Sequence, residues 1–80
     1  MYYVYRIEST RDASRTYTGF TEDLKERLRA HNQGSNRSTA PFRPYKLIFY
    51  ASFADRDKAL DFERYLKTGS GKAFGNKRLW

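Results

Sequence analysis

Aromatic side chains most constrain what this chain can fold into. Seven Tyr, six Phe and one Trp occur among only 80 residues, although the hydrophobic fraction as a whole is 39%. Each such ring can bury roughly 150–250 Å², so the rings can supply the core that so short a chain otherwise lacks. Disordered chains are poor in aromatic residues. We therefore expect one folded domain over residues 1–80.

The composition excludes several classes of protein. The chain has no Cys, which rules out a disulfide scaffold, a thiol nucleophile and Cys-based metal sites, and its single His rules out a multi-His metal site within one chain. No apolar run approaches the roughly 20 residues that span a bilayer, and the first residues do not resemble a signal peptide. We expect a cytoplasmic protein with no membrane partner.

Positive charge is concentrated in two stretches. Sixteen Lys and Arg against nine Asp and Glu give a net charge of +7, and no acidic residue occurs from 27 to 54 or after Glu63. Such segregation favours a basic surface that faces a polyanion such as nucleic acid. The alternative is a cationic surface that only keeps a small protein soluble.

The first half of the chain predicts a hairpin followed by a helix. Tyr2–Ile7 is aromatic and β-branched and reads as a strand, residues 9–14 as a turn, and Thr16–Phe20 as the second strand. Thr21 is the expected N-cap of a helix that ends near Asn32–Gly34.

A third strand is expected after a loop. Residues 35–44 contain Ser, Asn and both prolines and follow Gly34, so they read as a loop, and Lys46–Phe53 has strand composition. With a second helix after it, the order is ββαβα. This order predicts an α+β fold with a small three-stranded antiparallel sheet flanked by helices.

The second helix and the tail are placed by their capping residues. Asp55 is the expected N-cap of a helix that runs to about Lys67–Thr68, where Gly69 and Gly71 should stop it. From Lys72 onward we expect at most one short helical turn.

Polar residues occur on the apolar faces of both helices. Leu24 and Leu28 mark the buried stripe of the first helix, and Arg27 and His31 fall within its width. Burying an Arg and a His is costly unless they meet a partner or an anion. A lone His is more often structural than functional, and that reading of His31 stays open.

A carboxylate occupies the inward face of the second helix, where Ala59, Phe62 and Leu66 surround Glu63. It needs a cation there, which is either Arg27 in a structural ion pair or a metal. Strand tyrosines are usually core residues, but two of them facing an Arg, a His and a Glu would favour a reactive site.

These residues together resemble a known family. Tyr3-Val4-Tyr5 followed by Tyr17-Thr18-Gly19 is similar to the paired motif of the GIY-YIG nuclease superfamily. The resemblance extends to Arg27 in EDLKERLRAHNQG, to FRPYKLIFYASF and to Glu63 in KALDFERYLKTGSGKAF, and so covers essentially the whole chain. It is strongest to the small single-domain members.

The resemblance implies an endonuclease that hydrolyses phosphodiester bonds, with DNA the favoured substrate, and uses a single divalent ion, Mg²⁺ or Mn²⁺. It assigns the catalytic roles to five residues, of which Glu63 is also the metal ligand: Tyr5, Tyr17, Arg27, His31 and Glu63. Three positions depart from the pattern, because Tyr3 replaces Gly, Thr18 replaces Ile and Phe20 stands where some repair enzymes have Lys. None of these removes a principal catalytic group.

We expect nucleic acid to contact five cations and one amide, which are Arg29, Arg37, Arg43, Lys67, Lys72 and Asn76. The favoured general base is Tyr5, with Tyr17 or His31 assisting. Because the phenol pKa is about 10 and a nearby cation can lower it by about one to three units, activity should increase with pH.

Two other functions remain open at this stage. One is a nucleic-acid-binding module of the same fold that is catalytically weak or inactive. The other is a protein-interaction domain that pairs through its tyrosines. The sequence leaves the oligomeric state open between a monomer and a weak homodimer.

Overall fold

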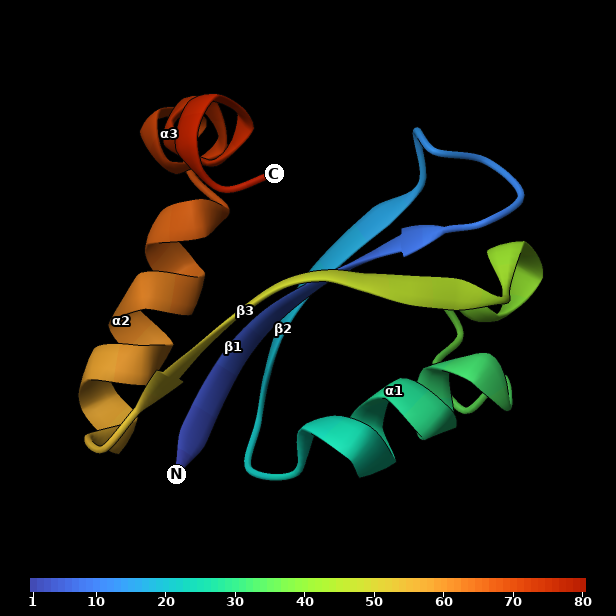
Figure 1. Cartoon of the computed structure of the whole chain (residues 1–80), viewed down its shortest axis with the longest axis horizontal. Helices are drawn as coiled ribbons and strands as arrows, with labels where there is room; N and C mark the ends of the chain where they lie inside the picture. Colours follow the sequence, from blue (N-terminus) through green and yellow to red (C-terminus); the bar gives the residue numbers. More distant parts are fainter.

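A three-stranded antiparallel sheet separates one helix from two others (Figure 1). The computed structural model describes all 80 residues, and no helix in it is long and apolar enough to cross a membrane. The elements in chain order are β1 (Tyr2–Ser9), β2 (Thr16–Thr21), α1 (Leu24–Asn32), the 3-10 helix η1 (Ala40–Phe42), β3 (Tyr45–Phe53), α2 (Arg56–Leu66) and α3 (Gly69–Arg78).

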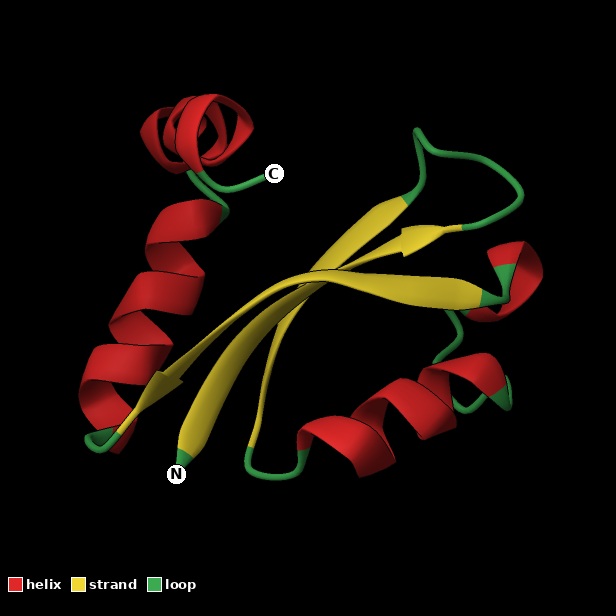
Figure 2. Ribbon diagram, in the orientation of Figure 1, coloured by secondary structure: helices red, strands yellow, loops and turns green.

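The predicted α+β fold with a three-stranded antiparallel sheet is confirmed (Figure 2). The strand order is β2-β1-β3, so β1 is the central strand and β2 lies at an edge. The first strand is longer than predicted, since it continues past Ile7 to Ser9. Its last residue pairs with Tyr45 of β3, and this pairing extends the ladder.

Each face of the sheet has its own small core. Val4 of β1 packs with Ala59 and Leu66 of α2, and all three are buried. Tyr5 and Ile7, on the opposite face of the same strand, form a second cluster that α1 covers with half-buried leucines. The alternation of side chains along β1 therefore decides which residues meet α1 and which meet α2.

The predicted N-cap of the first helix is wrong by two residues. Asp23, rather than Thr21, caps α1, because its carboxylate accepts from the backbone N–H of Glu26 at 3.1 Å. Thr21 is instead the buried last residue of β2, and its hydroxyl accepts from the N–H of Asp23. Two potential N-caps, Thr21 and Asp23, lie two residues apart here, and Thr21 belongs to the strand and not to the helix.

The predicted second helix is confirmed in its cap and its buried face. The Asp55 carboxylate accepts from the N–H groups of Asp57 and Lys58, and Ala59 and Leu66 are buried as expected. The helix ends at Leu66, close to the predicted end.

The expected C-terminal turn is a full helix of ten residues, α3. Gly69 and Gly71 do not stop α2 but form the first turn of α3, where the Thr68 hydroxyl accepts from the N–H of Gly71 at 3.0 Å. A Cβ on Gly71 would lie 1.8 Å from the carbonyl oxygen of Tyr65. This glycine therefore allows α3 to start against the end of α2.

Gly19 makes room for a buried tyrosine. It pairs with Tyr5 across the ladder between β1 and β2, and a Cβ on Gly19 would lie 2.6 Å from the Tyr5 hydroxyl. A residue with any side chain here would displace the ring, so this glycine fixes where the Tyr5 hydroxyl lies.

The substitution Gly19→Ala should destabilise the fold by about 1–3 kcal/mol, because overpacking forces the Tyr5 ring to move. Urea unfolding measures this loss. Gly69→Ala is the matched control, since nothing lies within 4 Å of its added Cβ, and it should be neutral or stabilising in a helix. Equal stability of the two variants would contradict the role given to Gly19.

Candidate active site

A buried hydrogen bond joins the central strand to α1. The Tyr5 hydroxyl lies 2.8 Å from Nε2 of His31, and each residue is only 1% exposed. The two rings meet edge to face with their centroids 5.8 Å apart. Two of the predicted catalytic residues therefore form one buried pair.

The second ring nitrogen of His31 is also hydrogen-bonded. Its Nδ1 lies 2.9 Å from the hydroxyl of Thr39, which is buried and donates to the carbonyl oxygen of Asn36 at 3.4 Å. A hydroxyl whose proton is committed to a carbonyl accepts from the ring, so Nδ1 carries the proton of neutral His31. Nε2 is then free to accept the Tyr5 proton.

Tyr17 extends this aromatic cluster toward the edge of the sheet. Its ring centroid lies 5.0 Å from that of His31 and 6.3 Å from that of Tyr5. Tyr17 is half-buried, whereas Tyr5 and His31 are enclosed. Of the three rings, Tyr17 is therefore the most accessible to solvent.

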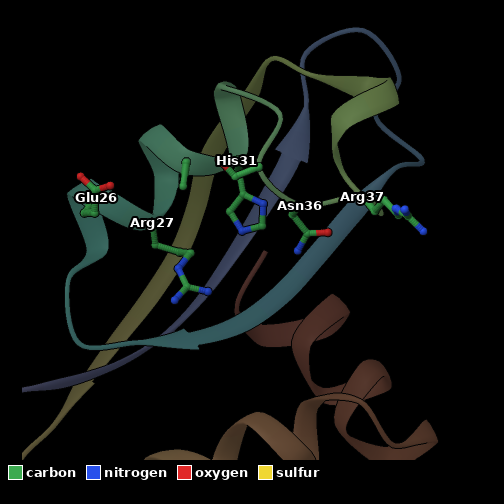
Figure 3. Close-up of a pocket in the computed structure, with 7 residues that line it drawn as sticks. Glu26, Arg27, His31, Asn36 and Arg37 are labelled. Atoms are coloured by element: carbon green, nitrogen blue, oxygen red, sulfur yellow. The ribbon is translucent and has the colours of Figure 1, made fainter.

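Arg27 lies beside the pair but is not buried with it. The sequence predicts Arg27 within the apolar stripe of α1, yet the residue is exposed. Figure 3 shows its guanidinium extending from α1 on the same side as the His31 ring, whereas Glu26 points away from that ring. The long side chain places the cation at the opening of the site while its Cα lies at the helix surface.

The pKa of Tyr5 is raised above its ordinary value rather than lowered. Burial is the main cause, and the negative charge of an ionised Tyr17 adds to it. The charge and a hydrogen-bond contact of Arg27 oppose these effects without cancelling them, and Glu63 raises the pKa slightly further. Arg27 thus acts in the expected direction, but burial outweighs it, so the net pKa of Tyr5 is raised and not lowered.

The pKa of His31 is lowered below its ordinary value. Burial disfavours the imidazolium, and the positive charge of Arg27 disfavours it further. His31 is therefore neutral at pH 7 and can accept a proton from Tyr5.

Glu63 pairs with a residue that the sequence does not single out as its partner. Its Oε2 lies 2.6 Å from Nζ of Lys67, one turn further along α2. The alternative of a structural ion pair between Arg27 and Glu63 is wrong, because no such pair lies within 4 Å. The Glu63 side chain is 20% exposed.

Glu63 is the carboxylate available for a metal ion at this site. No group of three or more His, Cys, Asp or Glu side chains that could hold a metal ion converges anywhere in the chain. Mg²⁺ is often held by one or two carboxylates together with water and substrate phosphates. Glu63 fits that requirement, and a divalent ion bound to it would have to displace the ammonium group of Lys67.

Two clefts adjoin this cluster and contain four of the six predicted nucleic-acid contacts. A cleft of about 500 Å³ is lined by Arg37 together with Arg27, His31 and Asn36, and Figure 3 shows the Arg37 side chain pointing away from the other three. A second cleft, of about 300 Å³, lies beside Tyr17 and contains three of the predicted residues, Lys67, Lys72 and Asn76.

The other two predicted contacts lie outside both clefts. Arg29 forms an ion pair with Glu26 on the exposed face of α1. Arg43 donates to the carbonyl oxygen of Ala40 at 3.1 Å and so supports the loop before β3.

Thr39 and Asn36, which orient the His31 ring, are not predicted from the sequence. Both lie in the stretch read as a loop, where Ser, Thr and Asn are common for purely local reasons. No periodicity marks them, and only the folded chain shows that the loop returns to α1.

An arginine and a carboxylate beside a tyrosine–histidine pair, with basic clefts on either side, make a site suited to phosphate chemistry. The chain matches the family described as the GIY-YIG catalytic domain over residues 1–78. It therefore belongs to the GIY-YIG nuclease family. Nucleases of this family generally use a divalent metal, and the domain implies binding to nucleic acid.

Several bacterial proteins are similar in sequence. The chain is 40% identical over 52 residues to a UPF0213 protein of Lacticaseibacillus paracasei, which covers 64% of this chain and 58% of that protein. It is also 40% identical over 52 residues to the UPF0213 protein YazA of Bacillus subtilis, covering 64% and 52%.

The similarity to the UPF0213 protein SpyM50708 of Streptococcus pyogenes is 37% over 67 residues and covers 81% of this chain and 70% of that protein. The matched region is thus little more than half the length of the first two relatives.

The variant Thr39→Val should lose the single Nδ1–H tautomer of His31 and about 1–3 kcal/mol of stability, because a buried N–H would be left without an acceptor. Nitrogen-15 spectra of the imidazole measure the tautomer, and His31 is the only histidine. Thr39→Ser keeps the hydroxyl and is the control. An unchanged tautomer in the valine variant would show that Thr39 does not orient the ring.

Proposed function

We propose that this domain is a divalent-metal-dependent endonuclease that hydrolyses phosphodiester bonds in DNA. The observation that carries the proposal is the hydrogen bond between Tyr5 and a neutral His31, located beside the exposed cation of Arg27. Membership of the GIY-YIG family supports the reaction class. The metal and the choice of DNA are part of the proposal.

Arg27 binds the phosphate that reacts. A guanidinium is planar and donates two parallel hydrogen bonds to phosphate oxygens. Because Arg27 is exposed and without an acidic partner within 4 Å, it can meet a phosphate without first breaking an ion pair. Its charge then stabilises the negative charge that increases on the phosphate oxygens in the transition state.

Tyr5 and His31 move the proton of the attacking water. The water oxygen forms a bond to phosphorus while its proton passes to the Tyr5 oxygen, and the Tyr5 proton passes to Nε2 of His31. The bond from phosphorus to the leaving sugar oxygen breaks, and that oxygen takes a proton from solvent. This route needs no free phenolate, which suits a tyrosine whose pKa is raised by burial.

Glu63 is the residue that would hold the divalent ion. Bound there, the ion would neutralise charge on the phosphate and stabilise the leaving oxygen. With a single carboxylate that is already paired with Lys67, affinity for the ion is expected to be low until substrate adds its own oxygens.

Cleavage of labelled single-stranded, duplex, flap and four-way-junction DNA, and of matched RNA, tests the proposal. With Mg²⁺ or Mn²⁺ the protein should nick DNA, and EDTA should abolish nicking. Arg27→Ala and Glu63→Gln should each lose at least a hundredfold in rate, because they remove transition-state charge stabilisation. The matched control is Asp61→Asn, an exposed carboxylate on the same helix that pairs with Arg64.

The result that favours a binding module is equally specific. Binding that weakens with salt, with no cleavage above that of Glu63→Gln, would assign the fold to nucleic-acid binding without turnover. Cleavage that persists in both Arg27→Ala and Glu63→Gln would reject the proposed site while leaving the activity in place.

The pH dependence of the rate distinguishes a neutral Tyr5 that passes its proton to His31 from a Tyr5 phenolate that acts as the base. If His31 accepts the proton, the rate should fall only at pH values below the ordinary histidine pKa of about 6.5, because the pKa of His31 is lowered and the neutral form persists down to that range. Between pH 7 and 9 the rate should be nearly flat. A tenfold increase per pH unit in that range would indicate a phenolate base instead, and His31→Gln should remove the acid limb.

A further inference from the structure

The second cleft contains an arginine that the catalytic proposal does not use. Arg6 lies next to Tyr5 on β1, so its side chain points to the opposite face of the sheet. Its guanidinium donates to the hydroxyls of Thr18 at 3.1 Å and Thr16 at 3.0 Å. It also lies 4.1 Å from the centroid of the Trp80 ring.

Arg6 has no carboxylate partner although it is partly enclosed. It belongs to none of the five ion pairs within 4 Å, and its Nε is the one buried side-chain polar atom without a hydrogen-bond partner. A cation held out of water without a counterion is costly. Its pKa is lowered, mainly by burial, and the negative charge of Glu8 offsets that effect only in part.

Other positive groups surround the same cleft. Lys67 and Lys72 line it together with Arg6, and no Asp or Glu does. Asn76 accepts from the indole N–H of Trp80 at 2.9 Å, which holds that ring against Arg6. The cleft has a volume of about 300 Å³. Lys67 is paired with Glu63, whereas Arg6 and Lys72 have no carboxylate within 4 Å, so an anion in the cleft would neutralise their charge.

The cleft adjoins the reaction centre. Tyr17 is part of its wall and at the same time contacts the His31 ring, with centroids 5.0 Å apart. Lys67, which pairs with Glu63, has its Nζ 5.9 Å from the Tyr17 ring. An anion in the cleft would therefore be a close neighbour of the phosphate that reacts.

We infer that this cleft binds a second phosphate of the same nucleic-acid strand, next to the bond that is cut, and that Arg6 is its main ligand. The inference rests on the proposed function for the identity of the strand. The guanidinium is held by the two threonines and the indole, so little side-chain freedom is lost when an anion binds to it. Lys67 and Lys72 add charge at the rim.

Trp80 provides a direct readout because it is the only tryptophan in the chain. Its fluorescence is followed during titration with a short oligothymidylate in EDTA, where no turnover occurs. In Arg6→Gln the dissociation constant should rise about tenfold, the loss expected when a charged hydrogen-bond donor is removed. The salt dependence of log K should become shallower by about 0.7, the value for one single-strand phosphate contact.

Two further variants keep the test decisive. Lys72→Gln changes an exposed residue of the same cleft, so it should fold even if Arg6→Gln does not, and it should also weaken binding and lower the salt slope. Arg64→Gln removes the same charge from an exposed arginine that pairs with Asp61, and it should bind like the parent protein. Thermal unfolding of all variants checks that each is folded.

Three results would overturn the inference. If Arg6→Gln or, should it not fold, Lys72→Gln binds like Arg64→Gln, the contact between Arg6 and Trp80 is packing only. If every charge variant weakens binding equally, the effect is general electrostatics. If inorganic phosphate alone changes the Trp80 fluorescence with a dissociation constant as low as that of the oligonucleotide, the cleft is a site for a free anion.

Cleavage assays on the same variants separate this inference from the proposed function. A protein that cuts DNA but binds oligothymidylate independently of Arg6 and Lys72 is a nuclease without this subsite. A protein that never cuts, but whose binding depends on Arg6, keeps the phosphate site and loses the catalytic role.

Discussion

The position of the Tyr5 ring depends on the missing side chain at Gly19, and the rest of the site is arranged around that ring. Because the hydroxyl of Tyr5 occupies the space that a Cβ would take, it can reach His31 on α1. His31 in turn is held by Thr39 from the loop that follows α1. A strand, a helix and a loop are thus joined by two hydrogen bonds on one imidazole.

The same strand serves both faces of the sheet, and this explains how a chain with so small a core can hold a polar site. Val4 and Tyr5 are both buried, yet they face different helices. Arg6 follows on the face of Val4 and stacks on Trp80. The cations Arg6 and Arg27 lie outside the two buried clusters, so the hydrophobic packing and the charged groups do not compete for one interior.

The sequence predicts the fold well because its strongest signals are local. Alternating aromatic strands, the Asp55 cap and the apolar face of α2 each depend on near neighbours, and each is confirmed. The failures occur where a local signal has more than one meaning. Thr21 and Asp23 can each cap a helix, and Gly71 can either stop a helix or, as here, let the next helix start against the Tyr65 carbonyl.

The structure brings Tyr5, Tyr17 and His31 together, but the sequence does not predict which other groups hold these side chains. Helical spacing placed His31 on the inner face of α1, whereas its contact with Thr39 requires a loop to return across the fold. Glu63 was expected to meet Arg27 or a metal, and it meets Lys67 instead. Burial of Tyr5 outweighs the charge of Arg27 in setting its pKa, and only the structure shows how deep that burial is.

The edge position of β2 has a mechanical consequence. The cleft with Arg27 lies on the face of α1, and the cleft with Arg6 lies on the face of α2 and α3. A nucleic-acid strand that occupies both clefts has to bend around the edge of the β-sheet within a few nucleotides. Duplex DNA has a persistence length of about 150 base pairs and resists such a turn. In the proposed function, this arrangement would favour a polymer with local flexibility, which nicks, flaps and unpaired segments provide.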